Sequence, residues 1–101
     1  MTRAELLEKL RELKPWLEEQ GIVNLRLFGS YARDEAGPDS DVDLLVEFIP
    51  GEAPSGFALV DMQDELSAAF DGRKIDLAFP SILRNSYRRM AIEPQLRPVF
   101  E

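Results

Sequence analysis

Three short stretches in which apolar and polar residues alternate limit how this chain can fold. They cover residues 22–28, 41–48 and 74–79, and a period of two is typical of strands with one buried face. The segments between them are too long for tight hairpins, which favours a mixed sheet over a meander. We therefore predict an α/β (α+β) fold in which helices pack on a small mixed β-sheet. The expected core positions on the strands are Val23, Leu25, Leu27, Val42, Leu44, Val46, Phe48, Ile75, Leu77 and Phe79.

The N-terminal segment carries the clearest helical signals. Thr2 and Glu5 match a capping box ahead of leucines at helical spacing. Pro15 lacks a backbone donor, so it should kink this helix or restart it, and Gly21 should end it. Further helices are expected over residues 31–35 and 57–70 and after Ser81, which gives the order αβαβαβα and a tail broken by Pro94 and Pro98.

The composition narrows the possible chemistry. The 101 residues, a length typical of one domain over residues 1–101, include no Cys and no His. This excludes a disulfide scaffold, a zinc finger, a cysteine nucleophile and a Ser-His-Asp triad. A metal would be held by oxygen ligands, which favour Mg²⁺, Mn²⁺ or Ca²⁺. No apolar run approaches the ~18 residues of a membrane span, and we expect a cytoplasmic protein without membrane contact.

The charges are unevenly distributed along the chain. The net charge of −7 argues against direct nucleic-acid binding. From Arg73 to Arg97, however, six basic residues stand against only Asp76 and Glu93. An acidic body with a cationic end could bind a basic protein on one surface and a polyanion on the other. Solvated helix faces explain these charges equally well.

Three aspartates interrupt the apolar strands. Asp41 and Asp43 are two residues apart and therefore project from one face of the second strand, and Asp76 lies mid-strand in the third. Aspartate in the middle of a strand is unfavourable because its β-propensity is low and its charge loses solvation, so another group should compensate for the negative charge. We predict two Mg²⁺ ions, bridged by Asp41 and Asp43, with Asp76 binding one ion and taking a proton from an acceptor hydroxyl. For Asp41 and Asp43 alone, protection of a strand edge against aggregation explains the pair equally well.

A Gly-Ser turn follows the first strand. Gly29 leaves the backbone open to close approach by a ligand, and the free N–H groups there, with the Ser30 hydroxyl, suit the terminal phosphates of a nucleotide. Arg33, one helical turn beyond Ser30, is placed to reach the same phosphates. The turn alone is weak evidence for a phosphate site, but together with Asp41 and Asp43 it favours phosphoryl chemistry.

These residues resemble the signature of minimal nucleotidyltransferases of the DNA-polymerase-β-like superfamily. The resemblance rests on residues 29–33, 40–46 and 74–77 and covers nearly the whole chain. It implies a nucleotidyltransferase fold, with ATP as the substrate and Mg²⁺, or Mn²⁺ in its place, as the cofactor. The site residues that it implies are Gly29, Ser30, Arg33 and Ser40 for the nucleotide, and Asp41, Asp43 and Asp76 for the metal and the catalysis.

The resemblance also implies a partner. Minimal proteins of this family often act as antitoxins beside a HEPN-domain ribonuclease toxin and silence it by transferring AMP from ATP to a tyrosine. The chain leaves little length for recognising an acceptor, so the acceptor should come from a partner or from a second copy, and an oligomer with the partner is compatible with this. Asp34 departs from the pattern, because the family usually has Gly at this position. Its charge keeps two alternatives open: a binding module that neutralises the toxin by complex formation, and a nucleotide sensor without transfer.

Three aromatic residues complete the list of candidates. We expect Tyr31, beside the Gly-Ser turn, to be exposed and available to the nucleotide. Trp16 is expected to pack in the core or against a partner. Tyr87, among arginines of the last helix, could stack on a base or face a partner, and an ordinary helix surface explains it as well.

Overall fold

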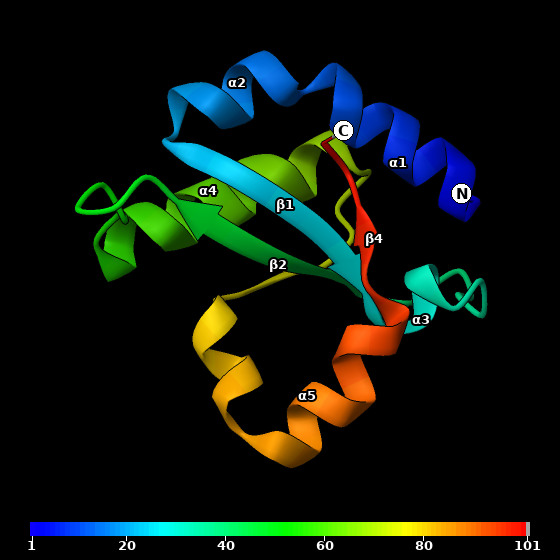
Figure 1. The fold of residues 1–101 in the computed structure, drawn as a ribbon. Coiled ribbons are helices and arrows are strands. Elements are labelled where there is room, and N and C mark those ends of the chain that lie inside the picture. The colour runs from blue at the N-terminus through cyan, green and yellow to red at the C-terminus, as the bar shows by residue number, and fades with distance from the viewer. Residues whose placement is uncertain (101) are drawn as a thin grey trace.

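A four-stranded sheet in the order β3-β2-β1-β4 organises the chain (Figure 1). The structure is a computed structural model and describes residues 1–100. The helical segments are α1 (Arg3–Glu12), α2 (Lys14–Glu19), α3 (Gly29–Ala32), α4 (Gly56–Ala69) and α5 (Ser86–Ile92), with the 3-10 turns η1 (Pro80–Arg84) and η2 (Glu93–Gln95). The strands are β1 (Ile22–Phe28), β2 (Val42–Phe48), β3 (Ile75–Ala78) and β4 (Arg97–Pro98).

The strand pairing confirms the predicted mixed sheet. β1 and β2 are antiparallel, whereas β2 and β3 are parallel because α4 carries the chain back between them. β4, which the sequence did not predict, pairs with β1 at an edge of the sheet, where a proline is tolerated. The next residue, Val99, is fully buried and donates its N–H to the Leu25 carbonyl at 2.9 Å. The C-terminal tail is therefore part of the fold.

One face of the sheet, called here the core face, is apolar. It lies against α1, α2 and α4, while η1 and α5 lie on the other side (Figure 1). The buried strand residues of the core face are Leu25, Leu27, Val42, Leu44, Val46 and Ile75. The helices contribute Leu6, Leu10, Leu17, Met62, Leu66 and Phe70 to the same cluster. The predicted alternation of buried positions therefore holds for most of the sheet.

The N-terminal helices follow the signals read from the sequence. The Thr2 hydroxyl accepts a hydrogen bond from the Glu5 N–H at 3.1 Å, and the Glu5 carboxylate accepts one from the Thr2 N–H at 3.0 Å. α2 restarts the helix with Pro15 in its first turn, where the missing donor is not needed. Gly21 follows α2 with a φ of +85°. The capping box, the restart and the helix end are thus confirmed.

The expected core position at Val23 is wrong. The side chain of Val23 is 54% exposed, while the neighbouring Ile22 is buried. The register between β1 and β2 shifts between Ile22 and Asn24, which marks a β-bulge. A bulge inserts one extra residue and reverses the alternation locally, so the inward position moves from Val23 to Ile22.

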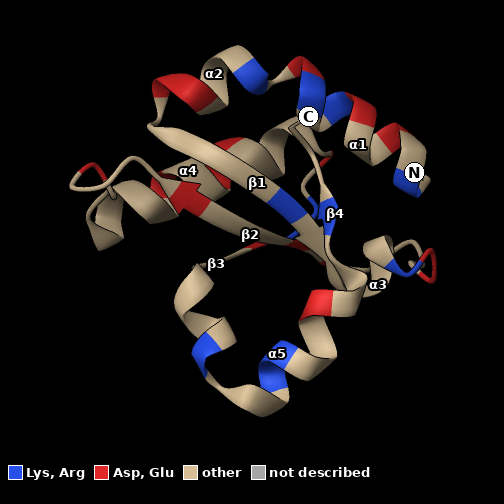
Figure 2. Cartoon of the chain, in the orientation of Figure 1, with Lys and Arg blue, Asp and Glu red and all other residues tan. Residues whose placement is uncertain are grey.

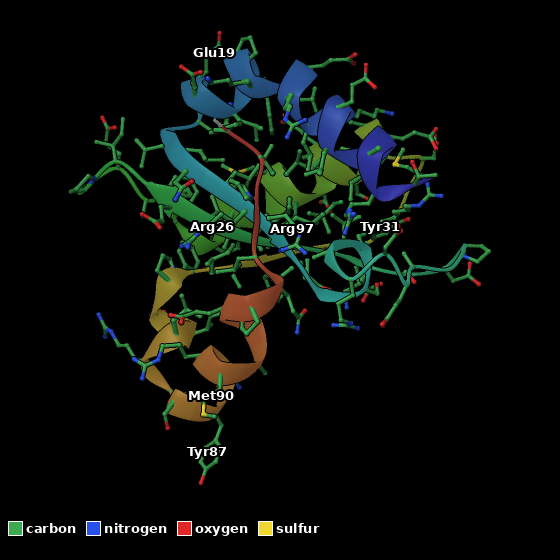
Figure 3. The ribbon with its side chains drawn as sticks, turned by 45° about the vertical axis from the view of Figure 1, so that its right-hand side comes forward. Glu19, Arg26, Tyr31, Tyr87, Met90 and Arg97 are labelled. Atoms are coloured by element: carbon green, nitrogen blue, oxygen red, sulfur yellow. The ribbon has the colours of Figure 1, made fainter. Side chains whose placement is uncertain are left out.

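The segment after β3 also differs from the prediction. In place of one helix capped by Ser81, it forms η1 and then α5, where the Asn85 side chain accepts hydrogen bonds from the N–H groups of Tyr87 and Arg88. Every residue of η1, α5 and η2 is exposed or half-buried. η1 contacts β2, while α5 extends away from the sheet, and Figure 3 shows Tyr87 and Met90 at the end far from the sheet. We call η1, α5 and η2 together the outer segment.

Charge is distributed differently on α4 and α5. The charged residues of α4 are all acidic, whereas α5 carries Arg88 and Arg89 (Figure 2). The cationic end predicted from the sequence therefore lies partly on the outer segment. Within residues 1–100, none of the helices is long and apolar enough to cross a membrane.

Candidate active site

The turn between β1 and α3 places the backbone against a carboxylate. Gly29 has a φ of +78°, and a Cβ atom at this position would overlap Oδ2 of Asp43. Only glycine therefore allows Asp43 to lie against the turn. The helix begins at Gly29 itself, so the predicted range of 31–35 is wrong. The close approach that the sequence analysis expected of a ligand is made here by the chain's own carboxylate.

Two of the three candidate carboxylates lie side by side. Asp43 of β2 and Asp76 of β3 are direct register partners in parallel strands, so their side chains project from the same face. This face, called here the second face, is opposite the core face. Its strand residues are Asn24, Arg26, Phe28, Asp43, Leu45, Glu47, Asp76 and Ala78. Asp41 is half-buried and lies one residue before the start of β2.

The three aspartates affect one another electrostatically. Burial, followed by the negative charges of Asp76 and Asp41, raises the pKa of Asp43 from 3.8 to about 6. A hydrogen bond with Asp76 raises this pKa further, and the positive charge of Arg33 lowers it. Lys74 places its Nζ 3.8 Å from Asp76 Oδ1. The carboxylates therefore lie at a place where added positive charge is favourable.

The residues fit a hard divalent cation that a substrate phosphate helps to hold. Within residues 1–100, no three ligating side chains are already grouped as a complete metal site. Mg²⁺ commonly takes one or two carboxylates and fills its remaining positions with water and substrate phosphate. Asp43 and Asp76 supply two carboxylates, and Asp41 is near enough to raise the pKa of Asp43. The donor chemistry and the repulsion within the pair both suit such an ion.

Gln95 joins the site from the C-terminal side, and the sequence analysis missed it. Its Oε1 accepts hydrogen bonds from the Gly29 N–H at 3.1 Å and from Arg33 Nη1 at 3.0 Å. Arg33 also donates from Nε to Glu35 Oε2 at 3.0 Å. Gly29 and Arg33 thus direct their donors at one oxygen atom. No pattern in the sequence marks Gln95, because 62 residues separate it from Arg33 and the chain between them must fold first.

The remaining candidate positions lie near the end of the sheet where β1 finishes and β2 starts. Ser30 is half-buried in α3. Ser40 is half-buried as well, and its hydroxyl accepts a hydrogen bond from the Gly37 N–H at 2.8 Å, which closes the predicted turn over residues 37–40. Asp34 has a φ of +60°. The aspartate therefore takes the left-handed conformation for which glycine is usual, and the turn persists.

The aromatic candidates have different locations. Tyr31 is only 2% exposed, and its hydroxyl accepts a hydrogen bond from Arg73 Nε at 3.0 Å, so the expected exposure to a nucleotide is wrong. The ring fills the core below α3 and ties this helix to the loop before β3. Trp16 packs half-buried against the core cluster, as expected. Tyr87 is 84% exposed on the outer segment.

A cavity of about 470 Å³ opens beside Asp41. It lies between the loop that precedes β2, which contributes Ser40, and the loop from α4 to β3, which contributes Arg73 and Lys74. Its lining carries Asp39, Asp41 and Asp71 as well as the two cationic residues and the Ser40 hydroxyl, so the space is polar. It provides room for a charged ligand beside Asp41.

Comparisons of the sequence identify the family. Residues 3–97 match the family described as "Nucleotidyltransferase domain". A "Putative protein adenylyltransferase" of Methanocaldococcus jannaschii is 36% identical over 96 residues, which cover 94% of this chain and 95% of the relative. "Protein adenylyltransferase MntA" of Thermococcus cleftensis is 34% identical over 93 residues, which cover 91% of each chain.

Comparisons of the structure agree. A solved structure of a "putative minimal nucleotidyltransferase" superposes with a TM-score of 0.73 at 30% identity, covering 97% of this chain and 96% of the other. A crystal structure of a "toxin-antitoxin with AMP-PNP" shares the fold with a TM-score of 0.68 at 21% identity, covering 91% of this chain and 72% of the other. The mixed sheet, the Gly29 turn and the paired aspartates thus occur in a chain that belongs to the nucleotidyltransferase domain family and has its fold.

Proposed function

We propose that this nucleotidyltransferase moves AMP from ATP to a tyrosine hydroxyl of a HEPN-domain toxin and thereby acts as its antitoxin. The observation that carries the proposal is the pairing of Asp43 with Asp76 directly beside the Gly29 turn. Paired carboxylates next to N–H and guanidinium donors suit metal-assisted phosphoryl transfer. The class of acceptor follows from the names of the two relatives, both called protein adenylyltransferases.

Each candidate residue has a role in this reaction. The triphosphate is held by the residues Gly29, Ser30, Arg33 and Ser40. The metal ligands are Asp41, Asp43 and Asp76, with two Mg²⁺ ions as the expected number and Mn²⁺ as a substitute. When bound, the ions neutralise phosphate charge and orient the phosphates. Asp76 accepts the proton of the acceptor hydroxyl, whose oxygen forms a bond to the α-phosphorus while the bond to pyrophosphate breaks.

The partner supplies the acceptor. Residues 1–100 form the sheet, its helices and the candidate site, and the proposal takes the acceptor hydroxyl from a second protein. The fold is shared with the antitoxin-containing structure named above, which supports a toxin as the partner. The net charge of −7 favours a basic partner and argues against direct nucleic-acid binding. We expect the two proteins to meet in the cytoplasm, as a complex or a larger oligomer, without a membrane.

Asp34 favours a second candidate function. Its exposed carboxylate follows Arg33 directly and adds negative charge where the triphosphate would bind. A site weakened in this way leaves a binding module that neutralises the toxin by complex formation alone. The two candidates differ in whether covalent transfer is required.

Label transfer from ATP distinguishes them. The chain is purified with its partner, incubated with radiolabelled ATP and Mg²⁺, and compared with the double variant Asp41→Asn, Asp43→Asn. The matched control is Asp61→Asn, Asp64→Asn on α4, which makes the same change of charge at exposed positions. We expect the site variant to lose label by at least about a thousandfold and the control to retain it. Label transfer that survives in the site variant would show that the catalytic assignment is wrong.

Neutralisation of the toxin is the second measurement. Under the leading proposal, the site variant still binds the toxin but no longer protects cells from it. Undiminished protection by the same variant would support the binding module instead. Mass spectrometry of the co-expressed partner then identifies the acceptor residue and the number of AMP groups added.

A further inference from the structure

Gln95 is held at both ends of its side-chain amide. The oxygen accepts from the Gly29 N–H and from Arg33 Nη1, and the nitrogen donates to the Ala91 carbonyl at 2.6 Å. The amide therefore has one orientation, in which its oxygen faces the donors of the Gly29 turn. A side chain at the end of the outer segment is thus connected to the candidate nucleotide site.

Two different donors point at this oxygen. The same arrangement would suit a phosphate oxygen in its place. One is a backbone N–H and the other a guanidinium N–H, and their distances to the oxygen are 3.1 Å and 3.0 Å. A phosphate oxygen carries negative charge and accepts such bonds more strongly than a neutral amide oxygen does. A phosphate group and Gln95 cannot use the same donors at the same time.

The segment that carries Gln95 is able to release it. η2 follows α5, and all residues of both elements are exposed or half-buried. Figure 3 shows the far end of α5, with Tyr87 and Met90, away from the sheet. Elements with few buried apolar contacts open at a small fraction of the global unfolding free energy. On the other side of Gln95, pairing of β4 with β1 and the buried Val99 keep the chain attached.

We propose that Gln95 is an internal stand-in for a nucleotide phosphate group, which displaces it from Gly29 and Arg33 and thereby frees the outer segment. This inference rests on the proposed function, because it assigns these two donors to the triphosphate. It adds that nucleotide occupancy is linked to the position of α5. The outer segment then differs between the free and the nucleotide-bound protein.

Two substitutions at Gln95 test the displacement in opposite directions. Gln95→Ala removes the competing oxygen and should tighten the dissociation constant for Mg²⁺-ATP at least about fivefold, because the two hydrogen bonds that this oxygen accepts no longer have to be broken. Gln95→Glu places a carboxylate of similar shape at the same donors and should weaken binding about tenfold. Binding is measured by titration calorimetry on the full chain. The control Gln63→Ala, on α4, should leave binding unchanged.

Comparing ligands with and without phosphate shows which part of the nucleotide competes with Gln95. Inorganic tripolyphosphate should reproduce the gain seen with Gln95→Ala, whereas the affinity for adenosine, which has no phosphate, should not change. If Gln95→Ala binds Mg²⁺-ATP as the wild type does or more weakly, Gln95 is a structural tie and the inference is wrong. If neither the wild type nor Gln95→Ala binds nucleotide or tripolyphosphate, the proposed function itself fails.

Hydrogen exchange on the wild-type chain gives a test that needs no variant. Saturating Mg²⁺-ATP should accelerate amide exchange over residues 86–95 severalfold, because the contact that holds this segment is lost. Exchange over residues 25–28 of β1 and 43–46 of β2, which pair in register beyond the β-bulge, should stay slow and serves as the internal control. Unchanged or slower exchange over residues 86–95 in the nucleotide-bound chain would contradict the displacement.

Discussion

The two faces of the sheet are made from the same strands but serve different purposes. On the core face, Leu44 is fully buried beneath three helices. One residue earlier, Asp43 on the second face has its pKa raised by burial and by two neighbouring carboxylates. Arg26, also on the second face, donates from Nη2 to Glu47 Oε1 at 3.0 Å, while its buried Nε has no hydrogen-bond partner among the described residues. Leu44 and Asp43 are neighbours in β2, yet the first is well packed in the core and the second carries an unfavourable charge.

This difference indicates how a chain of this length accommodates a reactive site. The core face supplies most of the hydrophobic stabilisation, and the second face carries groups that would be more stable if they were neutral or paired. A native structure keeps such groups only where the rest of the fold compensates for them. Truncation of an apolar side chain should therefore cost more stability on the core face than on the second face, whereas neutralising a carboxylate on the second face should raise stability, and the following predictions test this contrast.

The largest effect is expected from truncation of neighbouring leucines. Leu44→Ala should lower the free energy of unfolding by about 3–4 kcal/mol, because the cavity opens inside the main cluster. Leu45, 1% exposed, belongs to the second face, where the short η1 contacts β2. Leu45→Ala should cost about 2 kcal/mol, since η1 can collapse onto the space. Urea unfolding of both variants measures the difference, and equal losses would contradict the contrast between the faces.

The next effect comes from the turn that joins β1 to α3. Gly29→Ala should destabilise the chain by about 2–3 kcal/mol, because a side chain there is strained at φ +78° and collides with Asp43. Gly51→Ala is the matched control: its φ is +83°, but nothing lies within 4 Å of the added Cβ, so the cost should be about 1 kcal/mol. Thermal and urea unfolding compare the two. If Gly29→Ala costs no more than Gly51→Ala, the close approach of Asp43 is not what requires the glycine.

Local rules explain which features could be predicted from the sequence. The capping box at Thr2, the restart at Pro15 and the strand alternation each depend on residues within a few positions of one another. The pairing of Asp43 with Asp76 was also foreseen, because both stand among apolar residues on strands that must share one sheet. The roles of these aspartates in metal binding and catalysis remain predictions.

The features that the sequence did not reveal depend on contacts between distant segments. β4 holds two residues, one of them Pro98, and forms only because β1 offers a free edge. The contact of Gln95 with Gly29 follows from that pairing. Tyr31 is drawn inward because Arg73, 42 residues away, supplies a partner for its hydroxyl. A pattern within one segment cannot contain this information.

A smaller effect, of opposite sign, is expected at Asp43. Its pKa is raised from 3.8 to about 6 in the fold, so the folded state binds this proton more tightly than the unfolded chain. The stability contributed by this group therefore falls as the pH rises from about 4 to about 6 and levels off above. In metal-free buffer at pH 7, Asp43→Asn should stabilise the chain by about 1 kcal/mol, after allowance for solvent screening of this partly exposed group.

Urea unfolding across this pH range, with EDTA present, checks the expectation. The wild type and Asp43→Asn should converge in stability near pH 4 and separate by pH 7. Asp61→Asn, at an exposed position of α4, should follow the wild type throughout. Addition of Mg²⁺ should stabilise the wild type more than Asp43→Asn if this carboxylate binds the ion. A constant difference between the two chains from pH 4 to pH 7 would contradict the raised pKa.

The smallest effect is expected at the N-terminal cap of α1. Thr2→Ala removes the acceptor for the Glu5 N–H and should lower the free energy of unfolding by about 0.5–1 kcal/mol. Thr2→Ser keeps the hydroxyl and is the control. Hydrogen bonds from Thr2 lower the pKa of Glu5, so the contribution of its carboxylate is present above its ordinary pKa of 4.5 and is lost as the pH falls below it. Nucleotide binding should be nearly the same in both variants, because Thr2 bonds to Glu5 within the cap, while α1 is linked to α3 by Arg3, whose Nη1 donates to the Ala32 carbonyl at 2.9 Å. A change in affinity would show that the cap is energetically coupled to the site.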